Sequence, residues 1–337
     1  MWPCNNPGED ARLYKAVESC SNFAIDLGIN IPTGKDSLSM KQKYKDKEVI
    51  SPGTVIISAA ANCNDINNII EPVLINNNDS IYYINLSKDN FNLGGSALAQ
   101  TLGYIGNHSS DINDSKYFKK AFEIFQNLIK KGLISSGHDI SSGGLITSLL
   151  EMCFPETNIG AKIDLSFSKE SDIIKLLFNE NIGLIFQGKK EIESILESKN
   201  IFFSKIGKVN TSGVLKISKN DIDYEFKISK YRDIWYKTSY LLDIHQSGET
   251  KAIERFKNYK NHPLIFNFPN NFNGLSNNFK PNNKVKAAVI REKGSNSERE
   301  MAYAMNLAGF EVKDIHMTDL ILGRETLEDI NFIVAVG

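Results

Sequence analysis

The sequence predicts an α/β and α+β protein with more than one domain. The chain has 337 residues, 41% of them hydrophobic, and a single core rarely grows past about 250 to 300 residues. From about residue 90 onward, helical and strand patterns alternate, which is typical of layered domains. A separate run of strand, turn, helix and strand begins at residue 285. These three observations favour at least two domains.

Composition excludes several classes of protein. Lys and Arg number 39 and Asp and Glu number 40, giving a net charge of −1, so the basic excess that nucleic-acid backbones require is missing. The four cysteines form no CxxC pair, which favours a reducing compartment. Apolar runs fall short of the roughly 18 residues of a membrane-spanning helix, and the N-terminus lacks the order of a signal peptide. We therefore expect a cytoplasmic protein without nucleic-acid or membrane partners.

The first 90 residues predict one helix and two strands. A helix is expected over 9–27, and strands are expected at "GTVIISAAANC" (53–63) and "SIYYINL" (80–86). Between the helix and the first strand lies the polar stretch "IPTGKDSLSM" (31–40). Packing alone does not explain why polar residues gather there.

Charged residues give this polar stretch two interpretations. Lys35 would suit a phosphate as a point charge, and Asp36 would suit a metal ion or a hydrogen-bond donor. The alternative is a solvated loop in which the two side chains simply pair with each other. Spacing does not decide between them.

The middle of the chain alternates between helix and strand. A helix is expected at "YFKKAFEIFQNLIKKGL", with Phe118, Phe122, Phe125 and Ile129 on one face. A second helix is expected over 143–154. Strands are expected at 182–187 and 202–209. Together these elements predict a second layered domain.

The stretch "SSGHDISSGGL" (135–145) carries the clearest chemical pattern. Asp139 and Ser141 precede a glycine pair that opens a helix. The amides of Gly143 and Gly144 could face an anion at the positive helix end while Asp139 holds a divalent cation. Such a site would suit a nucleotide polyphosphate. The alternative makes a serine of this stretch an N-cap and Asp139 a turn residue.

Other polar residues have simpler interpretations. The glycine-rich turn "NLGGSALAQTLG" (92–103) reads as a tight turn followed by a capped helix. His138 and His316 are candidates for a general base, but structural roles are the simpler interpretation of both. A cysteine on a strand-to-helix elbow with a histidine partner is missing from the sequence, and with it a complete nucleophilic site.

The C-terminal part predicts the opening of a doubly wound parallel sheet. An Asn-, Pro- and Gly-rich linker (257–283) precedes "VKAAVIREKGSNSEREMAYAMNLAGFEVKDIHM", and "NFIVAVG" supplies a third strand. Ser297 and Glu300 have the spacing of a capping box, and Gly309 supplies the helix stop.

Taken in order, these motifs resemble a known family. "NPGEDARLYKAV", "PTGKDSLSMK", "LGGSALAQ", "GHDISSGGL" and "LFNENIGLIFQ", followed by "AAVIREKGSNSERE", are similar to the large, single-chain phosphoribosylformylglycinamidine synthases. The resemblance implies four parts. They are the end of an N-terminal-type synthetase domain of the aminoimidazole ribonucleotide synthetase-like superfamily (1–75), a C-terminal-type synthetase domain (76–225), a connector (226–284) and a truncated flavodoxin-like class I glutamine amidotransferase domain (285–337).

The resemblance also implies an activity and its ligands. The family's ligase of purine biosynthesis converts formylglycinamide ribonucleotide, glutamine and ATP into formylglycinamidine ribonucleotide, glutamate, ADP and phosphate, and the parent enzyme is expected to be monomeric. Asp139 is carried over as a Mg²⁺ ligand and Ser141 as an ATP or ADP contact. Lys35, Gly143 and Gly144 are expected to contribute to nucleotide binding.

Two function classes follow from the resemblance. The family's reacting site and its glutaminase Cys, His and Glu have no counterpart here, so we expect the chain to be an inactive fragment of the ligase. The alternative is a non-catalytic module for nucleotide binding and docking. A weaker rival is a stand-alone kinase or synthetase of the same superfamily.

Overall fold

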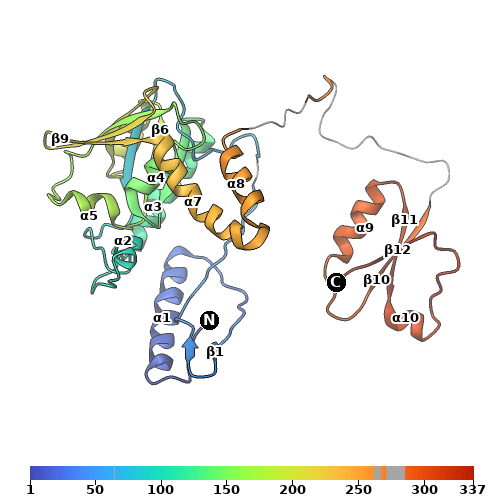
Figure 1. Cartoon of the computed structure of the whole chain (residues 1–337). Helices are drawn as coiled ribbons and strands as arrows, with labels where there is room; N and C mark the ends of the chain where they lie inside the picture. Colours follow the sequence, from blue (N-terminus) through green and yellow to red (C-terminus); the bar gives the residue numbers. More distant parts are fainter. Residues whose placement is uncertain (64, 262–266, 271–284) are drawn as a thin grey trace. The chain divides into compact units, whose positions relative to one another are not determined.

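Two units make up the chain, Met1–Tyr259 and Lys260–Gly337, and each is described by itself. The computed structural model describes residues 1–63, 65–261, 267–270 and 285–337 (Figure 1). In this part of the chain, no helix combines the length and apolarity needed to cross a membrane.

A seven-stranded sheet organises the first unit, with the strand order β4-β6-β3-β7-β5-β8-β9. Its strands are β3 (Ser80–Asn85), β4 (Ile134–Ile140), β5 (Gly160–Asp164), β6 (Gly183–Gly188), β7 (Ser204–Asn210), β8 (Val214–Lys219) and β9 (Ile222–Lys227). All neighbouring pairs are antiparallel except β5 and β8, which run parallel. The sheet is therefore mixed, and the predicted strands 80–86, 182–187 and 202–209 are confirmed within one or two residues.

Strand β3 shows that both faces of this sheet are buried. Its side chains alternate between two hydrophobic clusters: Ile81 and Tyr83 belong to one, and Tyr82 and Ile84 to the other. Since successive side chains of a strand point to opposite faces, each cluster lies on its own side of the sheet. The first unit is therefore layered, as the sequence predicts.

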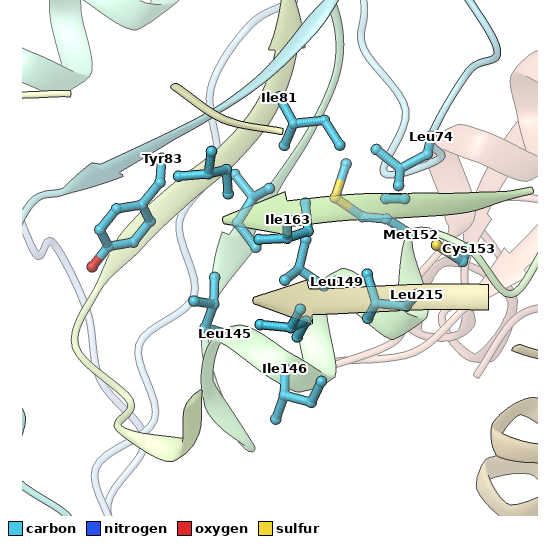
Figure 2. Packing of buried hydrophobic residues seen from close by; sticks show 14 of the residues in the cluster. Leu74, Ile81, Tyr83, Leu145, Ile146, Leu149, Met152, Cys153, Ile163 and Leu215 are labelled. Carbon is cyan, nitrogen blue, oxygen red and sulfur yellow. The ribbon is translucent and has the colours of Figure 1, made fainter. Parts of the chain in front are cut away.

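Helix α4 contributes most to the first face. This face carries α4 (Gly144–Glu151), α5 (Ile173–Phe178) and the start of α7 (Ile228–Ser247). Figure 2 shows Leu145, Ile146 and Leu149 of α4 packed with Ile81, Ile163 and Leu215 from the strands. The predicted helix 143–154 is confirmed, although the structure ends it at Glu151.

Helices α3 (Ser115–Lys130) and α6 (Glu191–Ser198) cover the second face. Helix α3 confirms the helix predicted at "YFKKAFEIFQNLIKKGL". Its buried face differs from the predicted one, because Phe122 is 49% exposed. The buried side chains of α3 are Tyr117, Ala121, Phe125 and Leu128. Phe118 is only partly buried against the second cluster, and its ring also contacts Phe23 of helix α1 (Glu9–Leu27), with ring centroids 5.6 Å apart.

The N-terminal part of the first unit has little regular structure. It contains α1 (Glu9–Leu27), as predicted, and a short hairpin of β1 (Lys41–Lys43) and β2 (Glu48–Ile50). The strand predicted at 53–63 is wrong. Within the described part of the chain, only Thr54 of this segment pairs with another backbone, exchanging two hydrogen bonds of 2.8 Å with Met1. A strand requires a neighbour along its length to bond its amides and carbonyls, and an apolar pattern does not supply one.

The predicted connector 226–284 begins with helices. Helix α7 is followed by α8 (Glu249–Asn258), and the ring of Tyr240 in α7 lies against Phe256 in α8 with centroids 4.9 Å apart. Much of the predicted linker 257–283 lies outside the described residues, which omit 262–266 and 271–284.

The second unit contains the predicted start of a doubly wound sheet. Strands β10 (Lys286–Arg291), β11 (Glu311–His316) and β12 (Phe332–Ala335) are all parallel, in the order β11-β10-β12. Helices α9 (Glu298–Leu307) and α10 (Met317–Ile321) accompany them. The strand that comes first in the chain, β10, lies between the second, β11, and the third, β12, which is the flavodoxin-like order.

The capping box predicted at the start of α9 is wrong. Ser297 has a φ of 71° and its side chain makes no capping hydrogen bond. A capping serine needs an extended backbone so that its hydroxyl can reach the amides of the first turn. The left-handed backbone of Ser297 does not meet that requirement.

Candidate functional site

Asp139 lies near the end of strand β4, at the edge of the sheet. The strand buries Ile134, Ser136 and Ile140, whereas the Asp139 side chain is 66% exposed. Its Oδ1 lies 3.3 Å from Nδ1 of His138, and Nε2 of His138 lies 3.6 Å from a carboxylate oxygen of Glu151. The structure therefore places Asp139 in a strand, and not in the turn of the alternative interpretation.

Asp139 has few neighbours that could share a metal ion with it. Among the described residues, no group of three or more His, Cys, Asp or Glu side chains has the arrangement of a metal site. Mg²⁺ commonly keeps several waters and takes one or two carboxylates together with phosphate oxygens. An exposed carboxylate such as that of Asp139 fits this mode of binding, and it does not fit a closed site made only of protein ligands.

The amides of Gly143 and Gly144 both have acceptors within the chain. The Gly143 amide donates to Oε1 of Glu180 at 2.8 Å, and the Gly144 amide donates to the Ser141 carbonyl at 3.0 Å. Gly143 itself is the N-cap of α4, without a side-chain capping bond. The interpretation of Ser141 or Ser142 as a capping residue is therefore wrong, and the side chain of Ser141 is exposed.

Close packing explains why two glycines stand at the start of α4. Both have left-handed backbones, with φ of 86° for Gly143 and 72° for Gly144. A Cβ on Gly144 would lie 2.5 Å from the Asn179 carbonyl oxygen, and one on Gly143 would lie 2.3 Å from Oγ1 of Thr147. Contacts that short are not tolerated, so this turn needs glycine for reasons of fold alone.

Glu180 is the residue of this region that sequence reasoning missed. Its Oε1 accepts a second hydrogen bond of 2.7 Å from the amide of Ala97, at the start of helix α2 (Ala97–Thr101). The segment "NEN" before strand β6 gives no sign of this role in the sequence. The other glycine-rich turn agrees with its prediction, because Ser96 caps α2 by accepting from the Ala99 amide at 3.2 Å.

Lys35 lies apart from Asp139, in a cleft of the N-terminal part of the chain. This cleft has a volume of 540 Å³, and of the described residues, those that line it all lie between Met1 and Ile57. The Lys35 ammonium donates to the Asp36 carbonyl at 2.9 Å and approaches the Ser37 hydroxyl at 3.3 Å. The cleft also includes Gly34. Lys35 is therefore bonded within its own loop, and it does not share a cleft with Asp139 or Ser141.

The solved structures that the chain resembles match about half of it. Thermotoga maritima PurL complexed with FGAR covers 50% of this chain and 30% of its own, with a TM-score of 0.41 and 15% identity. A hydrogenase maturation protein, HypE, covers 46% of this chain and 54% of its own, with a TM-score of 0.33 and 16% identity.

Three family models match separate segments of the chain. Residues 1–62 match an FGAR-AT PurM_N-like domain, and residues 78–220 match the C-terminal domain of proteins related to AIR synthase. Residues 284–337 match a CobB/CobQ-like glutamine amidotransferase domain. The fold class is therefore that of an AIR synthase-like domain followed by amidotransferase sequence, with mixed α/β structure.

Relatives align with the chain over almost its entire length. A probable phosphoribosylformylglycinamidine synthase of Arabidopsis thaliana, described as chloroplastic/mitochondrial, is 37% identical over all of this chain and 24% of its own length. Phosphoribosylformylglycinamidine synthases of Homo sapiens and Dictyostelium discoideum are 33% and 34% identical, over 100% and 98% of this chain. The chain spans about a quarter of the length of these relatives. Over almost its whole length, the chain is therefore similar to a part of the phosphoribosylformylglycinamidine synthases.

Proposed function

We propose that this chain works as part of a glutamine-dependent, ATP-consuming ligase of purine biosynthesis. The reaction converts formylglycinamide ribonucleotide, glutamine and ATP into formylglycinamidine ribonucleotide, glutamate, ADP and phosphate. The observation that carries the proposal is the order of three matched domains along one chain, at 1–62, 78–220 and 284–337. Identity of 33–37% to phosphoribosylformylglycinamidine synthases, over 98–100% of this chain, supports it.

The proposed nucleotide site lies at the junction of β4 and α4. Asp139 would hold Mg²⁺ and the Ser141 hydroxyl would contact the nucleotide, because both side chains reach solvent at this point. The remaining positions around the ion would be filled by water and phosphate oxygens. Gly143 and Gly144 would support the turn through their backbone conformation, since their amides already have acceptors.

Lys35 is proposed as a separate contact. Its ammonium lies in the cleft of the N-terminal part, together with Gly34, Asp36 and Ser37. The Lys35 ammonium has three N–H donors, of which the Asp36 carbonyl and the Ser37 hydroxyl accept two, so a third could bond a phosphate group. We assign to this cleft a phosphate-bearing ligand distinct from the one at Asp139.

Three further properties belong to the same proposal. Glutamine would be the nitrogen donor, through the amidotransferase domain matched at 284–337. The parent enzyme would be a monomer. A cytoplasmic location is proposed from cysteine usage, and an organellar location is the alternative, since the Arabidopsis relative is described as chloroplastic/mitochondrial.

Calorimetric titration of the full chain with Mg·ADP tests the nucleotide site. Asp139→Asn removes the charge of the proposed ligand with little change in shape, and we expect it to weaken binding by about tenfold or more. Asp221→Asn is the matched control, because Asp221 is exposed in the turn between β8 and β9. Equal affinities of the wild-type chain and Asp139→Asn for Mg·ADP would mean that Asp139 has only a structural role.

A further inference from the structure

One carboxylate oxygen joins the starts of two helices. Oε1 of Glu180 accepts hydrogen bonds from the amide of Gly143, at 2.8 Å, and from the amide of Ala97, at 2.7 Å. Both amides stand at helix starts, α4 and α2, where the first amides have no acceptor in their own helix. A negative charge is favourable there because helix starts carry partial positive charge.

The neighbours of Glu180 hold it in place. The side-chain amide of Asn179 donates to the Lys175 carbonyl at 2.7 Å, at the end of α5. The side-chain amide of Asn181, a residue only 1% exposed, donates to the carbonyl of Asn90 at 3.0 Å. The segment 179–181 therefore binds α5, the loop at residue 90 and both helix starts.

The start of α4, which Glu180 holds, follows directly after Asp139 at the end of β4 and Ser141 in the turn. The Ser141 carbonyl accepts the amide of Gly144, and the Asp139 carbonyl accepts the hydroxyl of Ser148 at 3.0 Å. Ser148 is a buried residue of α4. A shift in the start of α4 would therefore also move the backbone of Asp139 and of Ser141.

We propose that Glu180 is the positioning residue of the nucleotide site: its carboxylate fixes the turn at Gly143 against the turn at Ala97 and thereby places Asp139 and Ser141. This inference rests on the proposed function for its ligand. Glu180 also occupies the amide that a phosphate would use at this helix start. The nucleotide therefore approaches from the side of Asp139 and Ser141, and not along the axis of α4.

Hydrogen exchange of the full chain without nucleotide tests the coupling. In Glu180→Ala, we expect faster amide exchange in 95–101 and in 141–147 together, because both helix starts lose the same acceptor. Glu180→Gln retains a carbonyl oxygen that can accept both bonds, so its exchange should stay close to that of the wild-type chain. Exchange that rises in one segment only, or in neither, would overturn the proposal.

Titration with Mg·ADP tests the positioning role. Glu180→Ala should bind about tenfold more weakly than the wild-type chain, and Glu180→Gln should bind within about twofold. If Glu180→Ala does not fold, Glu180→Asp takes its place, because it keeps the charge on a side chain too short to reach both amides; faster exchange in both segments and weaker binding are expected of it. Glu197→Gln, on the exposed side of α6, is the control for the loss of one negative charge.

The outcomes separate the two proposals. Tighter binding by Glu180→Ala would mean that the carboxylate competes with phosphate, and it would overturn the positioning role. A wild-type chain that does not bind Mg·ADP counts against the proposed nucleotide site. In that case the exchange experiment alone decides whether Glu180 couples the two turns.

Discussion

The hydroxyl of Tyr82 donates a hydrogen bond of 2.8 Å to the carboxylate of Glu193, which lies 111 residues later in the chain. Tyr82 is fully buried in the central strand β3, and Glu193 belongs to helix α6 on the second face of the sheet. Burial is the main cause that raises the pKa of Tyr82, and the bond from Tyr82 is the main cause that lowers the pKa of Glu193. The pair therefore attaches α6 to the middle of the sheet.

Replacing Tyr82 with Phe removes the hydroxyl and keeps the ring, which stacks on Phe186 with centroids 5.5 Å apart. We expect the free energy of unfolding to fall by about 1.5 to 3 kcal/mol, the typical contribution of a hydrogen bond to a charged group. Urea denaturation measures the change. Tyr104→Phe is the control, because Tyr104 is 72% exposed. Equal losses in the two variants would contradict the assigned role of the bond.

Stability should fall in mild acid, and Glu193 should contribute to the fall. Its pKa in the folded chain is lowered, chiefly by the bond from Tyr82, and that of Asp164 is lowered chiefly by Ser166. A carboxylate with a lowered folded pKa stabilises the fold above its unfolded pKa, and this contribution is lost as the pH falls through the folded value. Urea titrations between about pH 7 and pH 3 should show the loss. In Glu193→Gln the slope should be shallower, and an unchanged slope would exclude Glu193 as a contributor.

Cys153 should resist alkylation in the folded chain. It is 1% exposed, and burial raises the pKa of its thiol to about 12. Since the thiolate is the reactive form, little of it exists at about pH 8. Iodoacetamide followed by mass spectrometry should modify the exposed Cys63 first and reach Cys153 only in urea. Modification of both cysteines at the same rate would mean that the region around α4 opens readily.

Gly144→Ala should destabilise the fold more than Gly95→Ala does. Both glycines have a left-handed backbone, with φ of 72° and 73°. A Cβ at Gly144 would lie 2.5 Å from the Asn179 carbonyl oxygen, whereas a Cβ at Gly95 meets open space. We expect Gly95→Ala to cost only the backbone strain, about 1 to 2 kcal/mol, and Gly144→Ala to cost more. Thermal unfolding measures both, and similar midpoints would show that the backbone near Asn179 can move aside.

Strands that are apolar on both faces and buried on both faces could be predicted from the sequence. Strand β3 is apolar at successive positions, and both of its faces are buried. The segment 53–63 is equally apolar, but Ile56 is 73% exposed and Ile57 is 59% exposed. The pattern reports which residues favour burial, and it does not report whether another strand lies alongside. That information depends on residues far away in the chain.

For the candidate site too, the sequence does not show which distant residues come together. Asp139 could be singled out because, with Ser141, it precedes a glycine pair that opens a helix. Glu180 could not, because its two partners, Gly143 and Ala97, lie 37 and 83 residues away. Nor could the sequence tell that the Gly143 amide already has an acceptor. The sequence pattern identified two exposed residues of the proposed site, and it missed the residue that is proposed to position them.

The place of β3 in the sheet has a consequence for synthesis of the chain. It is the first of the seven strands to be made, yet its neighbours are β6 and β7, about a hundred residues later. At roughly 5 to 20 residues per second, a ribosome would leave Ile81 to Ile84 without a partner strand for on the order of 5 to 20 seconds. Exposed strands of this kind recruit other chains. This segment, which ends buried on both faces of the sheet, is therefore a place where a nascent chain would benefit from a chaperone.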